Sequence, residues 1–407
     1  MKWEKRCLGD VADLCLGKML DEKKNKGEPL PYLANVNVRW GEFDFGNLRE
    51  MRFEDREKER YGLKYGDIVM CEGGEPGRCA IWKENVPGMM IQKALHRIRP
   101  HDYIDNQFLF YTFLLKGKSG AFSGLFTGST IKHFPREKLV LLEIEFPQLS
   151  VQKRIAEILT AYDDLIENNR RRMVLLEESA RLLYREWFVR LRFPGHESTR
   201  IVNGVPEGWR KVTLGDLATK IGSGVTPRGG DASYLTEGVP LIRSMNIYDD
   251  RFDPDGLAFI SDEQATRMAN VVVQSRDILI NITGASVARC CMAPERFVPA
   301  RVNQHVMIIR IEPLKASACF VHAAINSEER KRQLLSYAQK GSTREALTKE
   351  MLSNFEITLP SPELVTHFGE IAECNFLQRE TLALQNQKLR AARDLLLPKL
   401  MSGEIAV

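Results

Sequence analysis

The sequence predicts an α+β protein with two similar mixed α/β domains and two long helices, arranged as an internal repeat. Three observations predict this class: segments recur at a nearly constant offset, each copy begins with short apolar runs, and each copy ends with an apolar stripe of helical period. A chain of 407 residues, 43% of them hydrophobic, is long enough for two or three domains. The 19 Phe and 5 Trp exclude a mainly disordered chain.

The repeat is clearest at the two ends of each copy. Residues 8–12 (LGDVA) return as residues 214–218 (LGDLA), an offset of 206, and residues 128–130 (GST) return as 341–343, an offset of 213. A drift of this size corresponds to a few residues inserted in loops of the second copy, which is where duplicated domains usually diverge. Two copies of about 200 residues therefore make up the chain.

The first part of each copy is expected to contain strands. Short apolar runs bounded by Gly, Pro, Asn and Asp are typical of strands. Such runs cover residues 67–71, 94–98, 277–282 and 306–311. We therefore expect one mixed domain over residues 1–147 and a second over residues 199–360.

The second part of each copy is expected to be a long helix. From Ile155 to Trp187, apolar residues that include Leu159, Leu165 and Ile166 are spaced by threes and fours, as in a coiled coil. The same stripe recurs 213 residues later with more polar breaks. This pattern predicts helical spacers over residues 148–198 and 361–407, and Pro398 is expected to end the second.

Neither stripe is apolar enough to be stable alone, so the two helices are expected to pair with each other. An antiparallel pairing would relate the two mixed domains by a pseudo-twofold axis and hold them apart. Three polar residues interrupt the stripes, Asn169, Asn375 and Asn386. They either fix the register of the pair, as polar residues in coiled coils do, or lie at frayed or solvent-facing positions.

Two similar domains at a fixed separation fit duplex DNA, where two half-sites on one face lie about 34–36 Å apart. Because the two domains differ in sequence, we expect the half-sites to differ, with unread base pairs between them. The 58 Lys and Arg against 54 Asp and Glu give a net charge of only +4, so any basic surface must be local.

Two features of the sequence are specific marks of a known family: the twin Gly-Ser-Thr segments, each followed at the same distance by a Pro and a long helix, and the ending LLLPKLMSGEI at residues 395–405. With them, nearly the whole chain resembles the specificity subunit of type I restriction-modification enzymes. The resemblance implies that residues 1–147 and 199–360 are target recognition domains that bind the halves of a bipartite, asymmetric sequence of double-stranded DNA. It also implies that the helices set the spacing of these halves.

The resemblance further implies two modification subunits, which use S-adenosylmethionine to methylate adenine and dock on the helices. Two restriction subunits, which are translocase-nucleases using ATP and magnesium, would complete the restriction form. No catalytic residue, cofactor or metal is then expected in this chain. Accordingly the sequence contains no Asn-Pro-Pro-Tyr or Asp-Pro-Pro-Tyr methyltransferase segment, no phosphate-binding loop and no H-E-x-x-H pair.

Side chains that recognise bases are expected in loops beside the strands. Arg and Lys bind guanine, Asn and Gln bind adenine, and Ser and Thr bind either. In the first domain the candidates are Asn35, Asn37, Arg39, Arg78, Gln92 and Lys93. In the second domain they are Arg243, Ser244, Asn246, Arg289, Asn303 and Gln304. Ordinary surface or turn hydrogen bonding is the alternative role for each.

The Gly-Ser-Thr segments are candidates for contacts with DNA phosphates. They combine a flexible glycine with hydroxyls and a cation: Ser129, Thr130 and Lys132 in the first copy, Ser342, Thr343 and Arg344 in the second. A plain turn or a helix cap explains the same residues. The positive run at residues 170–172 is either a solvated helix face, a docking point for the modification subunit or a phosphate contact.

Two other functions remain open: a DNA-modifying enzyme whose active site is not recognised, and a coiled-coil scaffold that never binds DNA. No stretch approaches the roughly 18 to 20 apolar residues that span a bilayer, and the first residues lack the apolar run of a signal peptide. We therefore expect a cytoplasmic protein without membrane contact. The eight Cys form no C-x-x-C pair and are expected to be buried, reduced thiols.

Overall fold

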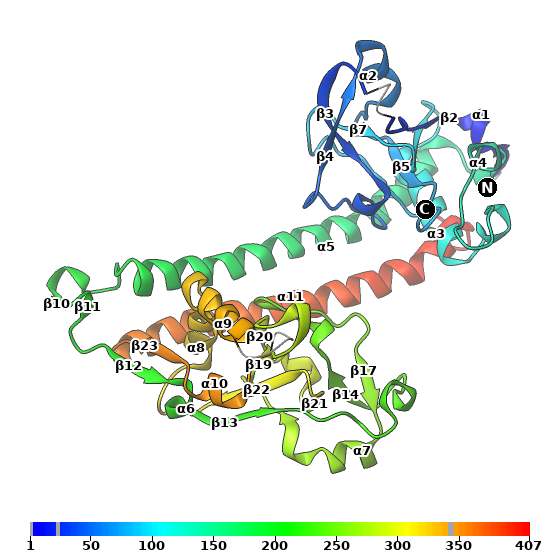
Figure 1. Cartoon of the computed structure of the whole chain (residues 1–407). Helices are drawn as coiled ribbons and strands as arrows, with labels where there is room; N and C mark the ends of the chain where they lie inside the picture. Colours follow the sequence, from blue (N-terminus) through cyan, green and yellow to red (C-terminus); the bar gives the residue numbers. More distant parts are fainter. Residues whose placement is uncertain (1–2, 22–24, 341–345) are drawn as a thin grey trace. The chain divides into compact units, whose positions relative to one another are not determined.

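The sequence repeat appears in the structure as two units, and the strands of their four-stranded antiparallel sheets follow one another in the same order. The structure is a computed structural model that describes residues 3–21, 25–340 and 346–407. Residues 1–167 and 386–407 form the first unit, and residues 168–385 form the second, so the long helices contribute to both. Figure 1 labels most of the helices and many of the strands of each unit.

The first unit contains two sheets and a strand pair. An antiparallel sheet has the order β2-β8-β5-β6, and a second sheet has the order β4-β3-β7, in which β3 and β7 are parallel. The strands are β1 (Glu4–Cys7), β2 (Ala12–Leu16), β3 (Glu28–Leu33), β4 (Arg49–Phe53), β5 (Ile68–Cys71), β6 (Cys79–Ile81), β7 (Met90–Ile91), β8 (Leu95–Pro100) and β9 (Glu143–Phe146), which pairs with β1. The short helices are α1 (Leu8–Val11), α2 (Asp55–Tyr61), α3 (Asn106–Lys118) and α4 (Arg136–Val140).

The second unit repeats this plan with additional strands. Its sheets have the orders β13-β22-β19-β20 and β17-β14-β21-β18, and β12 pairs with β23 as β1 does with β9. The strands are β10 (Ile201–Val202), β11 (Val205–Pro206), β12 (Arg210–Thr213), β13 (Ala218–Ser223), β14 (Val239–Ile242), β15 (Ile247–Tyr248), β16 (Arg251–Phe252), β17 (Ala258–Ile260), β18 (Val272–Val273), β19 (Ile278–Asn281), β20 (Cys290–Met292), β21 (Ala300–Val302), β22 (Val306–Ile311) and β23 (Glu356–Leu359). The helices are α6 (Leu214–Leu217), α7 (Asp262–Arg267), α8 (Ala318–Asn326), α9 (Glu328–Lys340) and α10 (Lys349–Ser353).

The four apolar runs expected to be strands are β5, β8, β19 and β22, so this prediction is confirmed. An ion pair with a buried carboxylate recurs at the same place in each unit, between an Arg on β8 or β22 and the Asp directly before β5 or β19. Arg99 binds both oxygens of Asp67 at 2.7 Å, and Arg310 binds those of Asp277 at 2.7 and 2.8 Å. The repetition of this pair shows that the two copies also share their side-chain register.

The two long helices are α5 (Leu149–Tyr184), which continues as a π-helical turn to Val189, and α11 (Pro362–Met401). Within each unit their segments run antiparallel, as expected. In the first unit Asn386 Nδ2 donates to the Ile166 carbonyl at 3.3 Å. In the second unit Asn375 Nδ2 donates to the Leu176 carbonyl at 3.3 Å. These bonds across the pair favour register-fixing over frayed positions for the polar stripe residues.

Details of the helical prediction are corrected by the structure. The first long helix ends at Val189 and does not run to residue 198, because Leu191 has a φ of 59° and Pro194 follows it. A separate 3-10 turn covers His196–Ser198. Pro398 does not end α11, which continues to Met401. The last turn is held by Leu397 and Leu400, both 1% exposed in the core of the first unit. Leu165, expected in the stripe, is 51% exposed.

The helices complete the core of each unit instead of lying outside it. Ile155 and Leu159 belong to the main core of the first unit. Trp187 and Phe368 belong to the main core of the second, where α8 also packs through Phe320. The bounds 1–147, 148–198, 199–360 and 361–407 therefore stay a prediction about domains, since the compact units divide the helices between them.

Five of the eight cysteines are buried as expected, and burial raises the pKa of the Cys290 thiol to about 12. Cys7 and Cys15 are half-buried. Cys374 is exposed on α11, so the expectation was wrong for this thiol. No helix in the part of the chain that the structure describes is both long and apolar enough to cross a membrane.

Candidate nucleic-acid interface

In the first unit, loops that contain the predicted site residues meet at one end of the sheet β2-β8-β5-β6. Asn35 Nδ2 donates to the Gly73 carbonyl at 3.4 Å, and Arg78 Nη2 donates to the Asn35 carbonyl at 2.9 Å. Gly73 also forms a β-bridge with His133 at the end of the loop 127–133. The turn after β5, the turn at residues 35–37 and the loop 127–133 thus form one cluster, which we call the first loop cluster.

The loop 127–133 presents the first Gly-Ser-Thr segment to solvent. Thr127 and His133 exchange backbone hydrogen bonds of 2.9 and 2.8 Å, which closes the loop. Gly128 has a φ of 92°, and a Cβ there would lie 2.2 Å from the Ile131 carbonyl oxygen, so only glycine fits. Ser129, Thr130 and Lys132 are exposed. The segment is therefore a tight turn whose hydroxyls and ammonium group are accessible to a ligand.

The second unit has an equivalent cluster after β19, which we call the second loop cluster. Asn281 Nδ2 donates to the Ser244 carbonyl at 2.9 Å, and Thr283 Oγ1 lies 2.6 Å from His305 Nδ1. Thr283 also forms a β-bridge with Ala346, as Gly73 does with His133. Of the predicted site residues, Ser342, Thr343 and Arg344 lie outside the described residues.

A hollow of about 450 Å³ opens in the second loop cluster. It is lined by Ser244, Thr283, Gly284, Ala285, Ser286, Arg289 and His305. Ser244 and Arg289 were predicted from the sequence, whereas Thr283, Ser286 and His305 were missed. The signal that could have found two of them is the polar segment Thr-Gly-Ala-Ser, which begins two residues after the buried strand β19.

Three of the predicted side chains are internal to their turns. Asn37 is 4% exposed and donates to the Asp44 carbonyl at 2.9 Å while accepting from the Ala34 N–H at 2.9 Å. Asn246, fully buried, makes the equivalent bonds in the second unit, including one to the Asp253 carbonyl at 3.0 Å. Asn303 is 7% exposed and accepts from the His305 N–H at 3.1 Å. Their amides shape the loops and do not face solvent.

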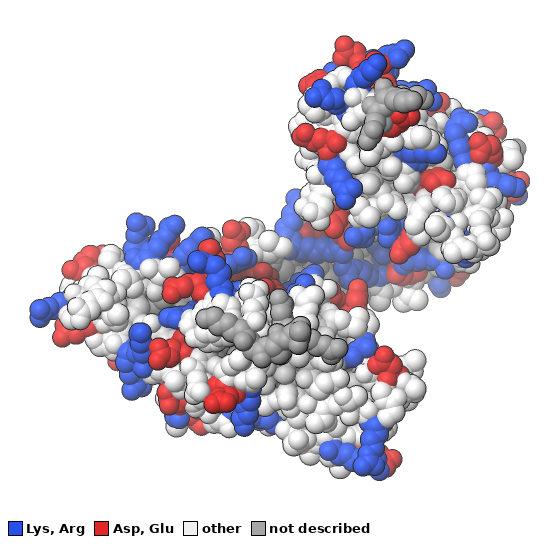
Figure 2. All heavy atoms as spheres, in the orientation of Figure 1, with Lys and Arg blue, Asp and Glu red and all other residues white. Residues whose placement is uncertain are grey.

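The remaining predicted side chains are partly or fully accessible. Arg39 donates to the Val36 carbonyl at 2.7 Å, and Gln92 accepts from the Ala94 N–H at 3.1 Å. Arg243 donates to the Gly256 carbonyl at 2.6 Å. Lys93 and Gln304 are exposed. On the face shown in Figure 2, basic and acidic side chains alternate over each unit, in line with the small net charge.

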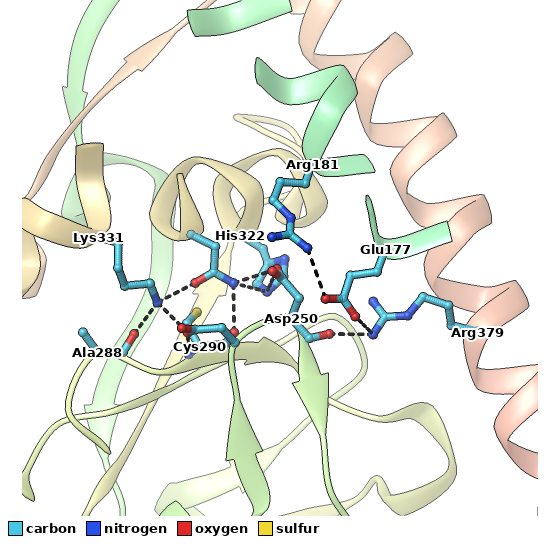
Figure 3. A network of polar contacts seen from close by, with 10 residues as sticks. Glu177, Arg181, Asp250, Ala288, Cys290, His322, Lys331 and Arg379 are labelled. Carbon is cyan, nitrogen blue, oxygen red and sulfur yellow. Dashed lines mark hydrogen bonds and ion pairs between the residues drawn. The ribbon is translucent and has the colours of Figure 1, made fainter. Parts of the chain in front are cut away.

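A polar network fixes the turn that carries Arg289 (Figure 3). Lys331 Nζ donates to the Ala288 carbonyl at 2.6 Å, and Asn326 Nδ2 donates to the Cys290 carbonyl at 2.9 Å. Arg379, on α11, donates to the Asp250 carbonyl and to Glu177, both at 2.8 Å. The same network encloses His322, and its burial lowers the pKa of this imidazole. The backbone on both sides of Arg289 is thus tied to α8, α9 and the long helices.

Lowering the pH below about 6.5 is expected to destabilise the first unit through His96. The imidazole is fully buried, its Nε2 lies 2.8 Å from the Phe134 carbonyl oxygen next to the loop 127–133, and desolvation lowers its pKa from the ordinary 6.5. The charge of Glu72 raises the pKa of His96, and the charge of Arg136 lowers it. Because the unfolded chain takes up the proton first, stability present above pH 6.5 is lost as the pH falls through this value.

Amide hydrogen exchange of β8 at pH 7.5 and 5.5 measures this effect. A His96→Gln variant, whose neutral amide also donates to the Phe134 carbonyl, is the matched control at each pH. We expect protection to fall with pH in the native chain and to change less in the variant. Equal changes in both chains would contradict a role for His96.

The comparison with protein families identifies the chain. Residues 1–178 and 206–366 match the model of the type I restriction modification DNA specificity domain, once for each copy of the repeat. The chain belongs to this family. The two matched segments include both loop clusters, most of α5 and the beginning of α11.

Curated relatives of this specificity subunit match it over nearly their whole length. The MjaIX specificity subunit of Methanocaldococcus jannaschii is 23% identical, covering 100% of this chain and 94% of the relative. The HindI specificity subunit of Haemophilus influenzae is 21% identical, covering 91% of this chain and 92% of the relative. A crystal structure of a type I S subunit from M. genitalium has the same fold, with a TM-score of 0.57, 17% identity and coverage of 98% and 96%.

The chain is therefore a DNA specificity subunit of a type I restriction-modification system. Specificity subunits are non-catalytic and have no cofactor of their own, because the catalytic activity of these systems resides in other subunits. Membership of the family implies DNA, methyltransferase and restriction partners. The rival functions of DNA-modifying enzyme and DNA-independent scaffold are thereby set aside.

Proposed function

We propose that each loop cluster contacts one half of a bipartite, asymmetric DNA sequence. The observation that supports this most directly is the repetition of the cluster at the same end of equivalent sheets with different side chains. The turn after β5 holds Glu72 and Glu75, whereas the turn after β19 holds Thr283 and Ser286. Side chains of different hydrogen-bonding character select different bases, so the two halves of the target should differ.

The accessible candidates are assigned to DNA contact and the internal ones to loop geometry. In the first unit the proposed contacts are Asn35, Arg39, Gln92, Lys93, Ser129, Thr130 and Lys132. Arg78, which pairs with Glu75 and donates to the Asn35 carbonyl, is assigned to loop geometry. In the second unit the proposed contacts are Arg243, Ser244, Arg289 and Gln304. Ser342, Thr343 and Arg344, which lie outside the described residues, are proposed as contacts from the repeat of the Gly-Ser-Thr segment alone. Asn37, Asn246 and Asn303 hold the turns that present them.

The long helices are proposed to set the spacing between the two halves and to dock the partner subunits. Two modification subunits would bring S-adenosylmethionine, and two restriction subunits would bring ATP and magnesium. The exposed Arg171 and Arg172 on α5 lie on a helix face that such a subunit can contact. Because the target is the DNA of the host cell, the assembly is proposed to act in the cytoplasm.

Mapping methylated adenines in the genome of a host that carries this subunit with its partners tests the proposal. We expect one motif with two unlike halves separated by unread bases, and no methylation at this motif when the subunit is omitted. Purified chain with labelled S-adenosylmethionine and the same DNA should give no methyl transfer. A continuous motif, a palindrome or methylation by the chain alone would contradict the proposal.

A further inference from the structure

We propose that Arg289 recognises a guanine in the DNA half contacted by the second unit. This inference rests on the proposed function, because it assumes that the second loop cluster meets DNA. It adds the class of base and the residue that selects it.

The guanidinium of Arg289 is held in place by a ring contact, but its hydrogen-bond donors are not used within the described part of the protein. It makes no hydrogen bond or ion pair with any side chain or carbonyl in residues 3–21, 25–340 and 346–407, and it lines the hollow. Its Cζ lies 4.9 Å from the centre of the Tyr248 ring, a cation–π contact that restrains the side chain. Its donors therefore stay available. Two parallel N–H groups of such a fork match the O6 and N7 acceptors of guanine in the major groove.

The backbone that carries this side chain is held in one conformation. Ala288 has a φ of 65°, a left-handed conformation that a side chain seldom adopts. Lys331 fixes its carbonyl, and Asp249 accepts from the Cys290 N–H at 3.1 Å (Figure 3). A restrained turn loses little conformational entropy when a ligand binds, which favours a specific contact over a mobile phosphate clamp.

The counterpart of Arg289 in the first unit is Arg78, whose guanidinium is bound by other groups of the protein. Arg78 follows Gly77, which has a φ of 90°, as Arg289 follows Ala288, and both are the residue before the equivalent strands β6 and β20. Arg78 is bound by Glu75 at 2.5 Å and donates to the Asn35 carbonyl, and its side chain is only 14% exposed. The same position thus presents a neutralised arginine in the first unit and an available one in the second.

The lining of the hollow suits a base edge rich in acceptors. Ser244, Thr283 and Ser286 contribute hydroxyls, His305 contributes a ring nitrogen, and no Asp or Glu is among the lining residues. A carboxylate at this place would repel O6 and N7 and would attract the amino groups of adenine or cytosine. The charge and the donors of the second loop cluster therefore favour guanine.

The test compares variants in the assembled complex of this chain with its modification subunits, using a randomised DNA library to measure the base preference at every target position. For Arg289→Ala we expect the preference for guanine at one position of one half to fall roughly tenfold to a hundredfold, with the other positions unchanged. Arg289→Lys keeps the charge but lacks the fork, so it should lose the same preference. Arg289→Gln should shift that position toward adenine.

Arg251→Ala is the matched control, because Arg251 lies 4.8 Å from the same Tyr248 ring but is 3.7 Å from Asp253. We expect it to leave the motif unchanged. A DNA probe with 7-deazaguanine at the assigned position should weaken binding of the native complex and have no further effect on Arg289→Ala.

Two results would overturn the inference and leave the proposed function intact. One is a uniform loss of affinity in Arg289→Ala with the salt dependence reduced by about one unit, which indicates a phosphate contact. The other is an unchanged motif in all three Arg289 variants. Absence of any sequence preference in the native complex is a different result, since it contradicts the proposed function itself.

Discussion

Replacing Arg310 with methionine is expected to lower the free energy of unfolding of the second unit by about 3 kcal/mol. The carboxylate of Asp277 is fully buried and is bound at both oxygens by Arg310. Removing the cation leaves an uncompensated charge in the core between β19 and β22, which costs far more than the pair itself contributes. Amide hydrogen exchange of β19 and β22 in native chain and variant measures the loss.

The repeat supplies a matched control for this prediction. Arg99→Met removes the equivalent cation in the first unit, where Asp67 is 1% exposed, and should reduce protection of β5 and β8 only. The double variant Asp277→Asn with Arg310→Met should recover more than half of the loss, because a neutral amide is less costly to bury than an unpaired carboxylate. A loss below about 1 kcal/mol in Arg310→Met would mean that water reaches the pair.

Exchanging residues 1–147 for the first domain of another specificity subunit is expected to change one half of the methylated motif completely and to leave the other half unaltered. The first loop cluster lies wholly within the exchanged segment, whereas the second lies wholly outside it. Each unit also has its own main core. Motif mapping by adenine methylation in the host measures the outcome.

The exchange must keep the contacts that residues 1–147 make with the helices of the first unit. Tyr111 donates to Asp163 at 2.7 Å, and Leu159 and Leu400 complete the same core. A donor domain with an aromatic hydroxyl at the position of Tyr111 is therefore the appropriate choice. The reciprocal exchange of residues 199–360 should alter the other half alone. A change of both halves in either chimera would contradict independent recognition.

The organisation of this protein could be predicted from its sequence because the signals are local or periodic. The offset between residues 8–12 and 214–218 shows a duplication without any structure, and runs such as residues 306–311 have the length and boundaries of strands. The spacing of the helical stripe predicted α5 and α11 and their antiparallel pairing. The end of each helix was less well predicted, since packing of Leu397 and Leu400 holds a turn past Pro398.

The candidate site was predicted less well, because accessibility depends on partners that are distant in the chain. Asn37 and Asn303 have the side chains that bind adenine, yet their amides are buried by bonds within their turns. His305 was not a candidate, because only the fold brings it beside Thr283.

The repeated segments and the helical stripe are enough to recognise a duplicated α+β protein of the specificity family, with two unlike domains and two paired helices. Which of two equivalent arginines is available to a ligand depends on contacts that exist only in the folded chain. Arg78 and Arg289 occupy the same position of the repeat, but the ion pair with Glu75 engages one and the ring of Tyr248 merely orients the other. A residue type sets what a side chain can bind, whereas the neighbours that folding brings to it set whether that capacity is already used.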